Sequence, residues 1–253
     1  MASKVAKLRG WWRNSFAGAA ARGLIKMLPR NTVLPILKGP LRGKKWVVGS
    51  SFQSCWLGVY EFEKQHEFTR IVKSGHVVYD VGANVGFYTL LAATLAGPEG
   101  RVYAFEPLPR NLALLKRHVE MNQMNNVEIL DGAVSDKPGT ARFSTGDIPE
   151  MTHLSDTGEI EVRTYQLDEL VSSARVPPPR VIKVDVEGAE ANVLAGARDI
   201  LQRHKPILLL ATHGAEVHQK CCDFLLEMGY SLHPLDDKPL ERSSEIRAEP
   251  PLA

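Results

Sequence analysis

In Val77-Val78-Tyr79-Asp80-Val81-Gly82-Ala83-Asn84-Val85-Gly86-Phe87-Tyr88-Thr89, an apolar run ends in an acidic residue and a glycine turn, and a helical pattern follows. The run predicts a buried strand, and the pattern after the turn predicts a helix over residues 87–96. Twenty residues past Gly86, Glu106 ends a second strand-like run, residues 101–105. A glycine turn after one strand and a carboxylate after the next are typical of a nucleoside-binding α/β site.

Each residue type at this turn has a physical role. Gly82 and Gly86 tolerate backbone angles that other residues avoid, and they leave room for a ligand against the main chain. The helix that begins at Phe87 offers unpaired N–H groups in its first turn. Glu106 is placed to accept hydrogen bonds from ribose hydroxyls, because a carboxylate only accepts. The sequence therefore predicts a cofactor that contains a nucleoside.

The spacing of the turn separates two cofactors. A dinucleotide fingerprint has the form G-x-G-x-x-G, whereas this turn reads G-x-N-x-G, with Asp80 two residues before the first glycine. A carboxylate at that place repels a pyrophosphate and suits a positively charged amino group. S-adenosylmethionine carries an ammonium, a carboxylate and no phosphate, so we favour it over NAD.

Length and composition set the class of protein. The 253 residues are enough for one large α/β domain with extensions. The chain has no apolar run long enough to span a bilayer, and arginines interrupt the N-terminus where a signal peptide needs an apolar core. Three cysteines, two of them adjacent (Cys221 and Cys222), predict no disulfide framework. We therefore expect a reducing, cytoplasmic setting.

The first 60 residues differ in charge from the rest. They hold eleven Lys or Arg and no Asp or Glu, whereas the remaining residues hold 20 basic and 29 acidic side chains, a net charge of −9. This pattern predicts a basic N-terminal extension, helical in parts over residues 1–30. We expect it to dock on its own domain or on a neighbour. Contact of residues 1–45 with an anionic membrane surface, at the inner face of the membrane, is the main alternative, and nucleic-acid binding is disfavoured.

Strand and helix patterns alternate after this extension, as in parallel sheets built from βαβ units. The expected strands are 76–81, 101–105, 127–130, 181–185 and 207–211, and the expected helices are 61–73, 87–96, 110–121, 189–202 and 216–228. A polar loop, residues 145–158, is expected to cover the site. Residues 230–235 and 239–240 are expected to form a hairpin. The predicted division is an extension (1–60), a domain (61–241) and a disordered tail (242–253).

Four motifs stand in order along the chain: Tyr79–Tyr88, Ala104–Pro107, Ala133–Asp136 and Ile182–Glu190. With them the chain resembles the FkbM family of S-adenosylmethionine-dependent methyltransferases, over about residues 61–240. The resemblance implies an α/β, Rossmann-like class I methyltransferase fold, with a mostly parallel seven-stranded sheet flanked by helices. It also implies methyl transfer to a hydroxyl on a small molecule, sugar or natural product. The identity of the acceptor, lipid-linked glycans included, stays open.

The resemblance also implies a set of cofactor-binding residues. The methionine end of the cofactor would be held by Asp80, Gly82, Asn84 and Gly86. The ribose would bind Glu106, and the adenine would lie near Pro107, Leu108, Asp131, Ala133 and Val134. Tyr60 and Glu61 are expected to close over the cofactor.

The expected chemistry lies where the strands 181–185 and 207–211 end, because ligands of parallel sheets sit at the carboxyl ends of strands. His213 is a candidate for the base that takes the hydroxyl proton, since imidazole titrates near neutral pH. Asp185 is expected to orient it or to act as the base, and Glu187 is a third candidate for substrate contact. The alternative is structural: Asp185 caps a turn and His213 is an edge residue. In the family an acid often stands two places before the histidine, and here Ala211 occupies that place.

Three further features have structural interpretations. Lys183, within a strand, is expected to pair with an acid. Glu190 is expected to complement a helix dipole. The aromatic-rich segment 46–56 is expected either to pack in the core or to form a wall of the substrate pocket.

Metal binding is an alternative that the sequence disfavours. Asp185, Glu187 and His213 suit Mg²⁺, but the Asp-Asn pair of catechol-type methyltransferases is missing. A second set has zinc-ligand types without a C-x-x-C pair: His213, His218, Cys221 and Cys222. We therefore predict no metal. Two other functions stay open, an NAD-dependent oxidoreductase and a non-catalytic nucleoside-binding protein tethered by its basic N-terminus.

Overall fold

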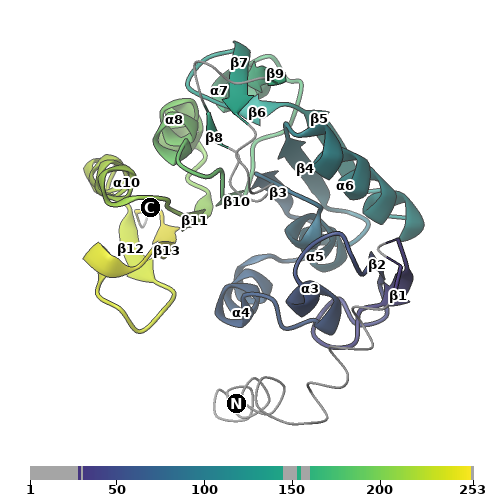
Figure 1. The fold of residues 1–253 in the computed structure, drawn as a ribbon. Helices are drawn as coiled ribbons and strands as arrows, with labels where there is room; N and C mark the ends of the chain where they lie inside the picture. The colour runs from purple at the N-terminus through teal and green to yellow at the C-terminus, as the bar shows by residue number, and fades with distance from the viewer. Residues whose placement is uncertain (1–27, 30, 145–152, 155–159, 252–253) are drawn as a thin grey trace.

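The computed structural model describes residues 28–29, 31–144, 153–154 and 160–251 (Figure 1). The predicted helical part of the extension and most of the predicted covering loop lie outside these residues. The central sheet is formed by β3 (Val77–Val81), β4 (Arg101–Glu106), β5 (Val127–Asp131), β10 (Val181–Val184), β11 (Ile207–Ala211), β12 (Ser231–Pro234) and β13 (Glu245–Glu249). The helices are α3 (Gln53–Leu57), α4 (Phe62–Ile71), α5 (Phe87–Ala96), α6 (Pro109–Met121), α7 (Leu167–Ser172), α8 (Glu190–Ala195), α9 (Arg198–Arg203), α10 (Ala215–Glu227) and the 3-10 turn η1 (Leu240–Arg242).

The seven strands of the central sheet stand in the order β12-β13-β11-β10-β3-β4-β5. The pairs from β11 to β5 are parallel, and β13 runs antiparallel to both of its neighbours. The strands at the centre are buried on both faces, as expected when helices cover both sides. The predicted mostly parallel seven-stranded sheet is confirmed. The chain order reverses between β3 and β10, which is where such sheets bind ligands.

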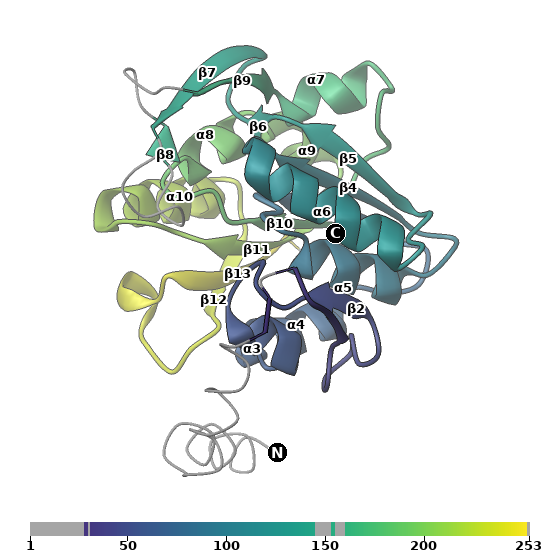
Figure 2. The ribbon, with the colours of Figure 1, turned by 45° about the vertical axis from the view of Figure 1, so that its right-hand side comes forward.

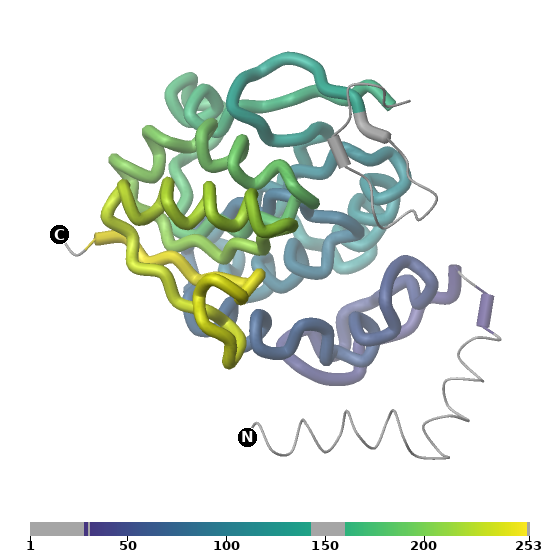
Figure 3. The backbone as a smooth tube through the Cα atoms, turned by 60° about the vertical axis from the view of Figure 1, so that its left-hand side comes forward, coloured from purple at the N-terminus to yellow at the C-terminus, as the bar shows by residue number. Residues whose placement is uncertain are grey.

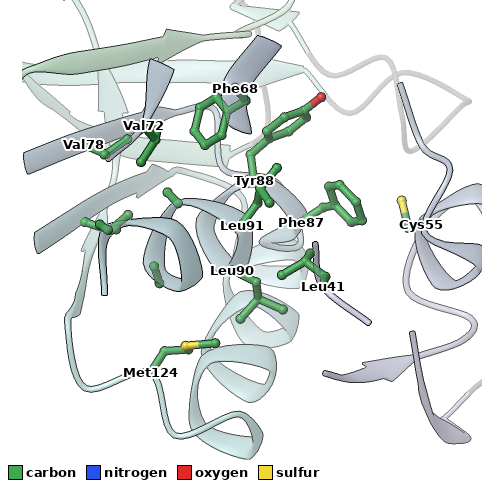
Figure 4. Packing of buried hydrophobic residues seen from close by; sticks show 14 of the residues in the cluster. Leu41, Cys55, Phe68, Val72, Val78, Phe87, Tyr88, Leu90, Leu91 and Met124 are labelled. Atoms are coloured by element: carbon green, nitrogen blue, oxygen red, sulfur yellow. The ribbon is translucent and has the colours of Figure 1, made fainter. Parts of the chain in front are cut away.

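Helices cover both faces of the sheet (Figure 2). One apolar cluster packs α7, α8, α9 and α10 on the face that carries Tyr79, Phe105 and Leu210. The other packs α4 and α5 on the opposite face, where Phe68, Tyr88 and Leu91 meet (Figure 4). This second face also carries charged residues, so the layer between the sheet and α4 is partly polar.

Residues 31–60 pack into the same core as the rest of the domain. They include β1 (Val33–Pro35) and β2 (Lys45–Val47), an antiparallel pair. Trp46 is fully buried and stacks on the His118 ring of α6, with ring centroids 4.0 Å apart. His118 Nε2 accepts a hydrogen bond from Val47 N (3.0 Å), and His118 Nδ1 lies 2.7 Å from Val85 O. Burial lowers the pKa of His118 to about 4, so a neutral ring links this segment to the glycine turn.

The C-terminal residues correct one prediction. Residues 242–253 were predicted to be a disordered tail, but Glu245–Glu249 form β13, inserted between β11 and β12. The predicted hairpin therefore pairs β12 with β13 and not with residues 239–240. Ile246 and Ala248 are fully buried, so β13 contributes to the core. Figure 3 traces this yellow hairpin beside the green helix α10.

The predicted helix over 189–202 is two helices, α8 and α9. The break falls at Gly196, where a Cβ atom would lie 2.1 Å from Ser135 O. Asp168 then caps α9, because its carboxylate accepts hydrogen bonds from Asp199 N and Ile200 N at 3.0 and 2.9 Å. A small second sheet beside this region contains β6 (Ala133–Val134), β7 (Gly139–Ser144), β8 (His153–Leu154) and β9 (Ile160–Tyr165).

Candidate active site

A cavity of about 300 Å³ lies at the carboxyl ends of β3, β4 and β10, where the chain order of the sheet reverses. This volume is within the range of small-molecule sites. One part of its lining comes from the glycine turn and β4, including Gly82, Asn84 and Glu106. The other part includes Asp185 and His213. The cavity therefore joins the two groups of residues that the sequence singled out.

The glycine turn that follows β3 packs closely against the backbone at the ends of β4 and β10. Gly82 has φ +77°, and a Cβ atom there would lie 1.9 Å from Asp185 O. The N–H groups of Gly82 and Ala83 both donate to Phe105 O, at 3.1 and 2.9 Å. These contacts require glycine at position 82, because any side chain would collide with the backbone after β10.

Glu106 is held by backbone N–H groups. Its Oε2 accepts a hydrogen bond from Asn84 N (2.7 Å), and its Oε1 accepts one from Leu108 N (2.9 Å). Burial raises the pKa of Glu106 to about 6, and the two N–H donors oppose that rise. The carboxylate is mostly ionised at neutral pH and keeps lone pairs for further donors.

Seven of the ten predicted cofactor residues line the cavity: Tyr60, Glu61, Gly82, Asn84, Glu106, Pro107 and Ala133, with Leu108 and Val134 beside them. Asp80, Gly86 and Asp131 are not part of this lining, and their contact with the cofactor stays a prediction. Asp80 is fully buried beneath the turn, where Thr89 Oγ1 donates to Oδ2 (2.6 Å) and Lys183 Nζ lies 3.2 Å from Oδ1. Gly86 packs against Leu115 of α6. Asp131 is exposed at the end of β5.

Lys183 pairs with an acid, as predicted. Besides Asp80, its Nζ donates to Gly82 O (3.1 Å), so it ties β10 to the glycine turn. Burial by itself would lower the pKa of Lys183, but the negative charges of Asp80 and Asp185 hold it above its ordinary value. This lysine therefore stays charged inside the domain.

His213 stands among three carboxylates. Its Nδ1 donates to Glu190 Oε1 (2.7 Å), and its Nε2 lies 3.4 Å from Glu187 Oε2 and 3.8 Å from Asp185 Oδ1. The hydrogen bond that His213 donates to Glu190 is the main reason that the pKa of His213 rises to about 9, although burial opposes the rise. The ring is therefore an imidazolium at neutral pH and has no free lone pair. This arrangement argues against the predicted role of His213 as the base.

Asp185 lies between cations. Its Oδ2 is 3.4 Å from Lys64 Nζ and 3.9 Å from Lys183 Nζ. Burial by itself would raise the pKa of Asp185, but the two lysines hold it below its ordinary value. Asp185 is therefore a stable anion and a hydrogen-bond acceptor.

Lys64 was missed by the sequence reasoning. It is buried in α4, and its Nζ contacts Glu245 Oε1 (2.6 Å), Glu61 Oε2 (3.0 Å) and Asp185 Oδ2. The sequence did indicate that Lys64 is buried, because it stands at helical spacing from Phe68 and Ile71 on the apolar face of α4. A lysine on such a face needs a buried partner.

Glu245 was also missed, since it lies in the predicted tail. It begins β13 and lines the cavity. Burial raises the pKa of Glu245 to about 7, and the charge of Lys64 opposes that rise. The strand signal was the alternation of polar and apolar residues in Glu245–Glu249.

The segment 46–56 serves both purposes that its aromatic content suggested. Trp46 is core, whereas Phe52 is half exposed at the cavity and stacks on Tyr60, with ring centroids 6.1 Å apart and planes inclined by 15°. Tyr88 of α5, also in the lining, donates its hydroxyl to Glu61 Oε2 (3.0 Å). Aromatic rings therefore form one wall beside the charged groups.

Among the residues that the structure describes, one group has metal-ligand spacing: Asp185, Glu187 and His213 place one ligand atom each within 4.8 Å of one another. The lysines beside Asp185 oppose a further cation there. The zinc-type set is not brought together. His218 instead hydrogen-bonds Thr212 Oγ1 (3.0 Å) and lies 3.5 Å from Cys222 Sγ inside the core. The absence of a metal stays a prediction.

A model of the methyltransferase FkbM domain matches residues 80–232. The hexuronic acid methyltransferase AglP of Haloferax volcanii is 36% identical over 128 residues, which are 50% of this chain and 52% of that protein. The 31-O-demethyl-FK506 methyltransferase FkbM of Streptomyces tacrolimicus is 29% identical, over 51% of this chain and 62% of that protein. The 2-O-methyltransferase NoeI of Sinorhizobium fredii is 29% identical, over 52% and 61%. The chain thus spans between half and two thirds of the length of these relatives.

Among solved structures, the methyltransferase FkbM of Methylobacillus flagellatus has a TM-score of 0.51 and 19% identity, over 76% of this chain and 51% of that one. This likeness concerns the fold alone. Within the described residues, none of the helices has the length and apolar character needed to cross a bilayer.

Proposed function

The chain belongs to the FkbM methyltransferase family, and we propose that it transfers a methyl group from S-adenosylmethionine to a hydroxyl of a small molecule, sugar or natural product. One observation carries the proposal. A single cavity contains both a preorganised carboxylate suited to a ribose, Glu106, and a charged cluster around Asp185 suited to an acceptor hydroxyl. A transferase needs both within one space, because the two reactants must meet.

The charges of the cavity fit this cofactor. Five carboxylates line it: Glu61, Glu106, Asp185, Glu187 and Glu245. Such a lining suits the sulfonium and ammonium of S-adenosylmethionine and repels the pyrophosphate of NAD. Glu106 would bind the ribose hydroxyls, and Pro107 and Leu108 would lie near the adenine. The cofactor supplies an already activated methyl group, so the protein has to bind, orient, exclude water and accept a proton.

Residues of the chain divide this work. Asp185, held ionised by its two lysines, would accept a hydrogen bond that orients the acceptor or the cofactor ammonium. His213, as an imidazolium, would donate a hydrogen bond and balance the acids around it. Glu187 is half exposed and would contact the acceptor at the rim of the cavity. Tyr60 and Glu61 would close the side formed by α4.

A sugar is the acceptor that the rim favours. Phe52, 53% exposed, and Tyr60 present a pair of nearly parallel rings at the cavity. The C–H face of a pyranose packs well on such rings, while its hydroxyls reach the carboxylates deeper in the cavity. Relatives named for a hexuronic acid and for 2-O-methylation support the same class.

Calorimetric titration with S-adenosylmethionine, S-adenosylhomocysteine and NAD tests the cofactor. We expect micromolar binding of the first two and none of NAD. Transfer of a labelled methyl group to a panel of hexuronic acids, neutral hexoses and lipid-linked sugars then tests the reaction. Binding of NAD alone would favour the oxidoreductase, and cofactor binding with no acceptor across the panel would favour the non-catalytic binder.

We further propose that the protein works in the cytoplasm and that its basic extension, besides docking on its own domain, contacts the inner membrane surface through residues 1–45. The eleven basic residues of the first 60, without one acid, support the contact. Sedimentation of the full chain with anionic and with zwitterionic vesicles tests it, with RNA as a competitor. We expect retention by anionic vesicles only, and weaker retention when Lys4, Lys7 and Arg9 are changed to Gln. Equal retention by both vesicle types would contradict the proposal.

A further inference from the structure

The antiparallel strand β13 brings a carboxylate into the cavity from the end of the chain. Glu245 is the register partner of Ala211, the last residue of β11. Residues opposite each other in an antiparallel pair point to the same face of a sheet. Glu245 therefore projects from the face that carries Lys183 and Asp80, toward α4, and it lines the same cavity as Asp185 and His213.

The backbone of Glu245 is fixed in this place. Its carbonyl accepts hydrogen bonds from Leu235 N and from Ser243 Oγ, both at 2.9 Å. The preceding carbonyl, of Ser244, accepts one from Thr212 N (2.8 Å), next to His213. The start of β13 is thus tied to the end of β11, and the carboxylate has a defined position.

The other acidic and basic groups of the cavity are already committed. His213 carries a proton, and Asp185 is a weak base because two lysines stabilise its anion. Glu61 accepts hydrogen bonds from Tyr88 and Lys64. Glu187 is paired with His213 at the exposed rim. Glu106, the other cavity carboxyl whose pKa is raised, to about 6, is held by Asn84 N and Leu108 N at the opposite part of the cavity.

Glu245 is half-buried, and its two oxygens lie in different environments. One oxygen, Oε1, contacts Lys64 Nζ, and the other, Oε2, is buried with no hydrogen-bond partner among the described residues. The charged and titratable groups that face it are Lys64 and Glu61 at α4, Asp185 after β10 and Tyr88 of α5. Burial outweighs the single cation and raises the pKa of the carboxyl to about 7. A base with such a pKa is ionised in a useful fraction at neutral pH and still holds a proton well.

We propose that Glu245 is the base that accepts the proton of the acceptor hydroxyl, an inference that rests on the proposed methyl transfer. The hydroxyl oxygen forms the new bond to the methyl carbon, and the carbon–sulfur bond breaks with its electron pair left on sulfur. The hydroxyl proton moves to the Glu245 carboxylate. Charge balances, because one sulfonium and one carboxylate become a neutral thioether and a neutral carboxyl.

This role also accounts for Ala211. The resemblance implies that an acid often stands at that position of β11, and in this chain Glu245 stands directly across the strand pair, on β13. A carboxylate on either strand would enter the cavity from the same face. The exchange Ala211→Glu with Glu245→Ala should therefore restore a base that Glu245→Ala alone removes.

Two readouts test the proposal. The first needs no acceptor: glutamate labelled with ¹³C at the side-chain carboxyl is titrated by NMR in the S-adenosylhomocysteine complex, and Glu245→Gln identifies the resonance. We expect a pKa near 7; titration in the ordinary range of glutamate, about 4.3, overturns the proposal. This readout judges Glu245 even if the wild-type chain transfers no methyl group, an outcome that would defeat the proposed function instead.

The second readout uses an acceptor found in the panel. We expect Glu245→Gln to lower kcat at least 100-fold, to leave cofactor affinity within about threefold, and to remove the rise of kcat with pH near 7. Glu249→Gln, on the same strand but outside the cavity, is the matched control and should keep both kcat and the pH profile. The double variant Ala211→Glu, Glu245→Ala should recover at least tenfold over Glu245→Ala. Retained turnover with an unchanged pH profile in Glu245→Gln overturns the proposal.

Discussion

The two ends of the cavity are built in different ways. At the cofactor end, Gly82, Asn84 and Glu106 come from one strand–helix–strand unit, and backbone N–H groups hold the carboxylate. At the proposed acceptor end, Lys64 of α4 joins Asp185, which follows β10, to Glu245 of β13. Backbone geometry restricts which residue types can stand at neighbouring positions, so a site built from the backbone can be recognised as a sequence motif. In a network of side chains from distant segments, the residue type at one position depends on the residues at the other positions. Such a network therefore produces no local sequence motif.

Glu106, which is buried, and Glu245, which is half-buried, illustrate the contrast. Burial raises the pKa of both, to about 6 for Glu106 and to about 7 for Glu245. Glu106 has its oxygens satisfied by fixed backbone donors, which suits a permanent acceptor. Glu245 depends on one lysine side chain that it shares with two other acids, which suits a group that changes its protonation.

The largest effect is expected at the glycine turn. Gly82→Ala adds a Cβ atom 1.9 Å from Asp185 O and should destabilise the fold by about 4 kcal/mol, with loss of cofactor binding. Gly43→Ala is the matched control, because Gly43 has a similar φ of +87° and no atom within 4 Å of the added Cβ. It should cost only about 1 kcal/mol. Equal effects in urea unfolding would mean that the turn is not closely packed.

At the proposed acceptor end, removing one charge should lower the stability of the fold. Lys64→Met leaves two acids, Glu61 and Glu245, without their shared cation and should cost about 3 kcal/mol of unfolding free energy. Lys220→Met, at an exposed pair with Glu216, should change it by less than about 0.5 kcal/mol. Urea unfolding measures both. If Lys64→Met changed the unfolding free energy only slightly, Glu61 and Glu245 would be able to become protonated in the folded chain with little loss of stability.

Glu106→Ala tests the cofactor end without breaking the fold. It removes a charged acceptor of ribose hydroxyls, and we expect S-adenosylhomocysteine to bind about 100-fold more weakly in calorimetry. Glu99→Ala, at an exposed position, should leave the affinity unchanged. An unchanged affinity for Glu106→Ala would remove the ribose assignment and with it the contrast between the two ends.

The smallest effect concerns pH. Folding raises the pKa of His213 from its ordinary value of 6.5 to about 9, so the folded chain holds this proton more tightly. The stability that it contributes is fully present below about pH 6.5 and is lost as pH rises through about 9. The side chain is 36% exposed, so the effect should be modest. When the pH is raised from 6 to 9.5, the unfolding free energy measured in urea should fall more for the wild type than for His213→Gln. Equal losses would contradict the ion pairs between His213 and the surrounding carboxylates.

Sequence reasoning succeeded where the signal was local. The helix Phe87–Ala96 and the strand Ile207–Ala211 have the predicted bounds, because each is an apolar run between glycine, proline or polar residues. It failed where a distant segment decided the outcome. The helix over 189–202 breaks at Gly196 because Ser135 packs there.

The sequence by itself determined the proposed cofactor end, since the turn at Gly82 and the carboxylate at Glu106 follow from the backbone of one βαβ unit. It also carried the mostly parallel seven-stranded sheet implied by the family resemblance. Only the tertiary structure decided the acceptor end, because the insertion of β13 between β11 and β12 brings Glu245 opposite Ala211 and within reach of Lys64. Burial at that meeting point sets which carboxylate titrates near neutral pH, and burial is a property of the packed chain.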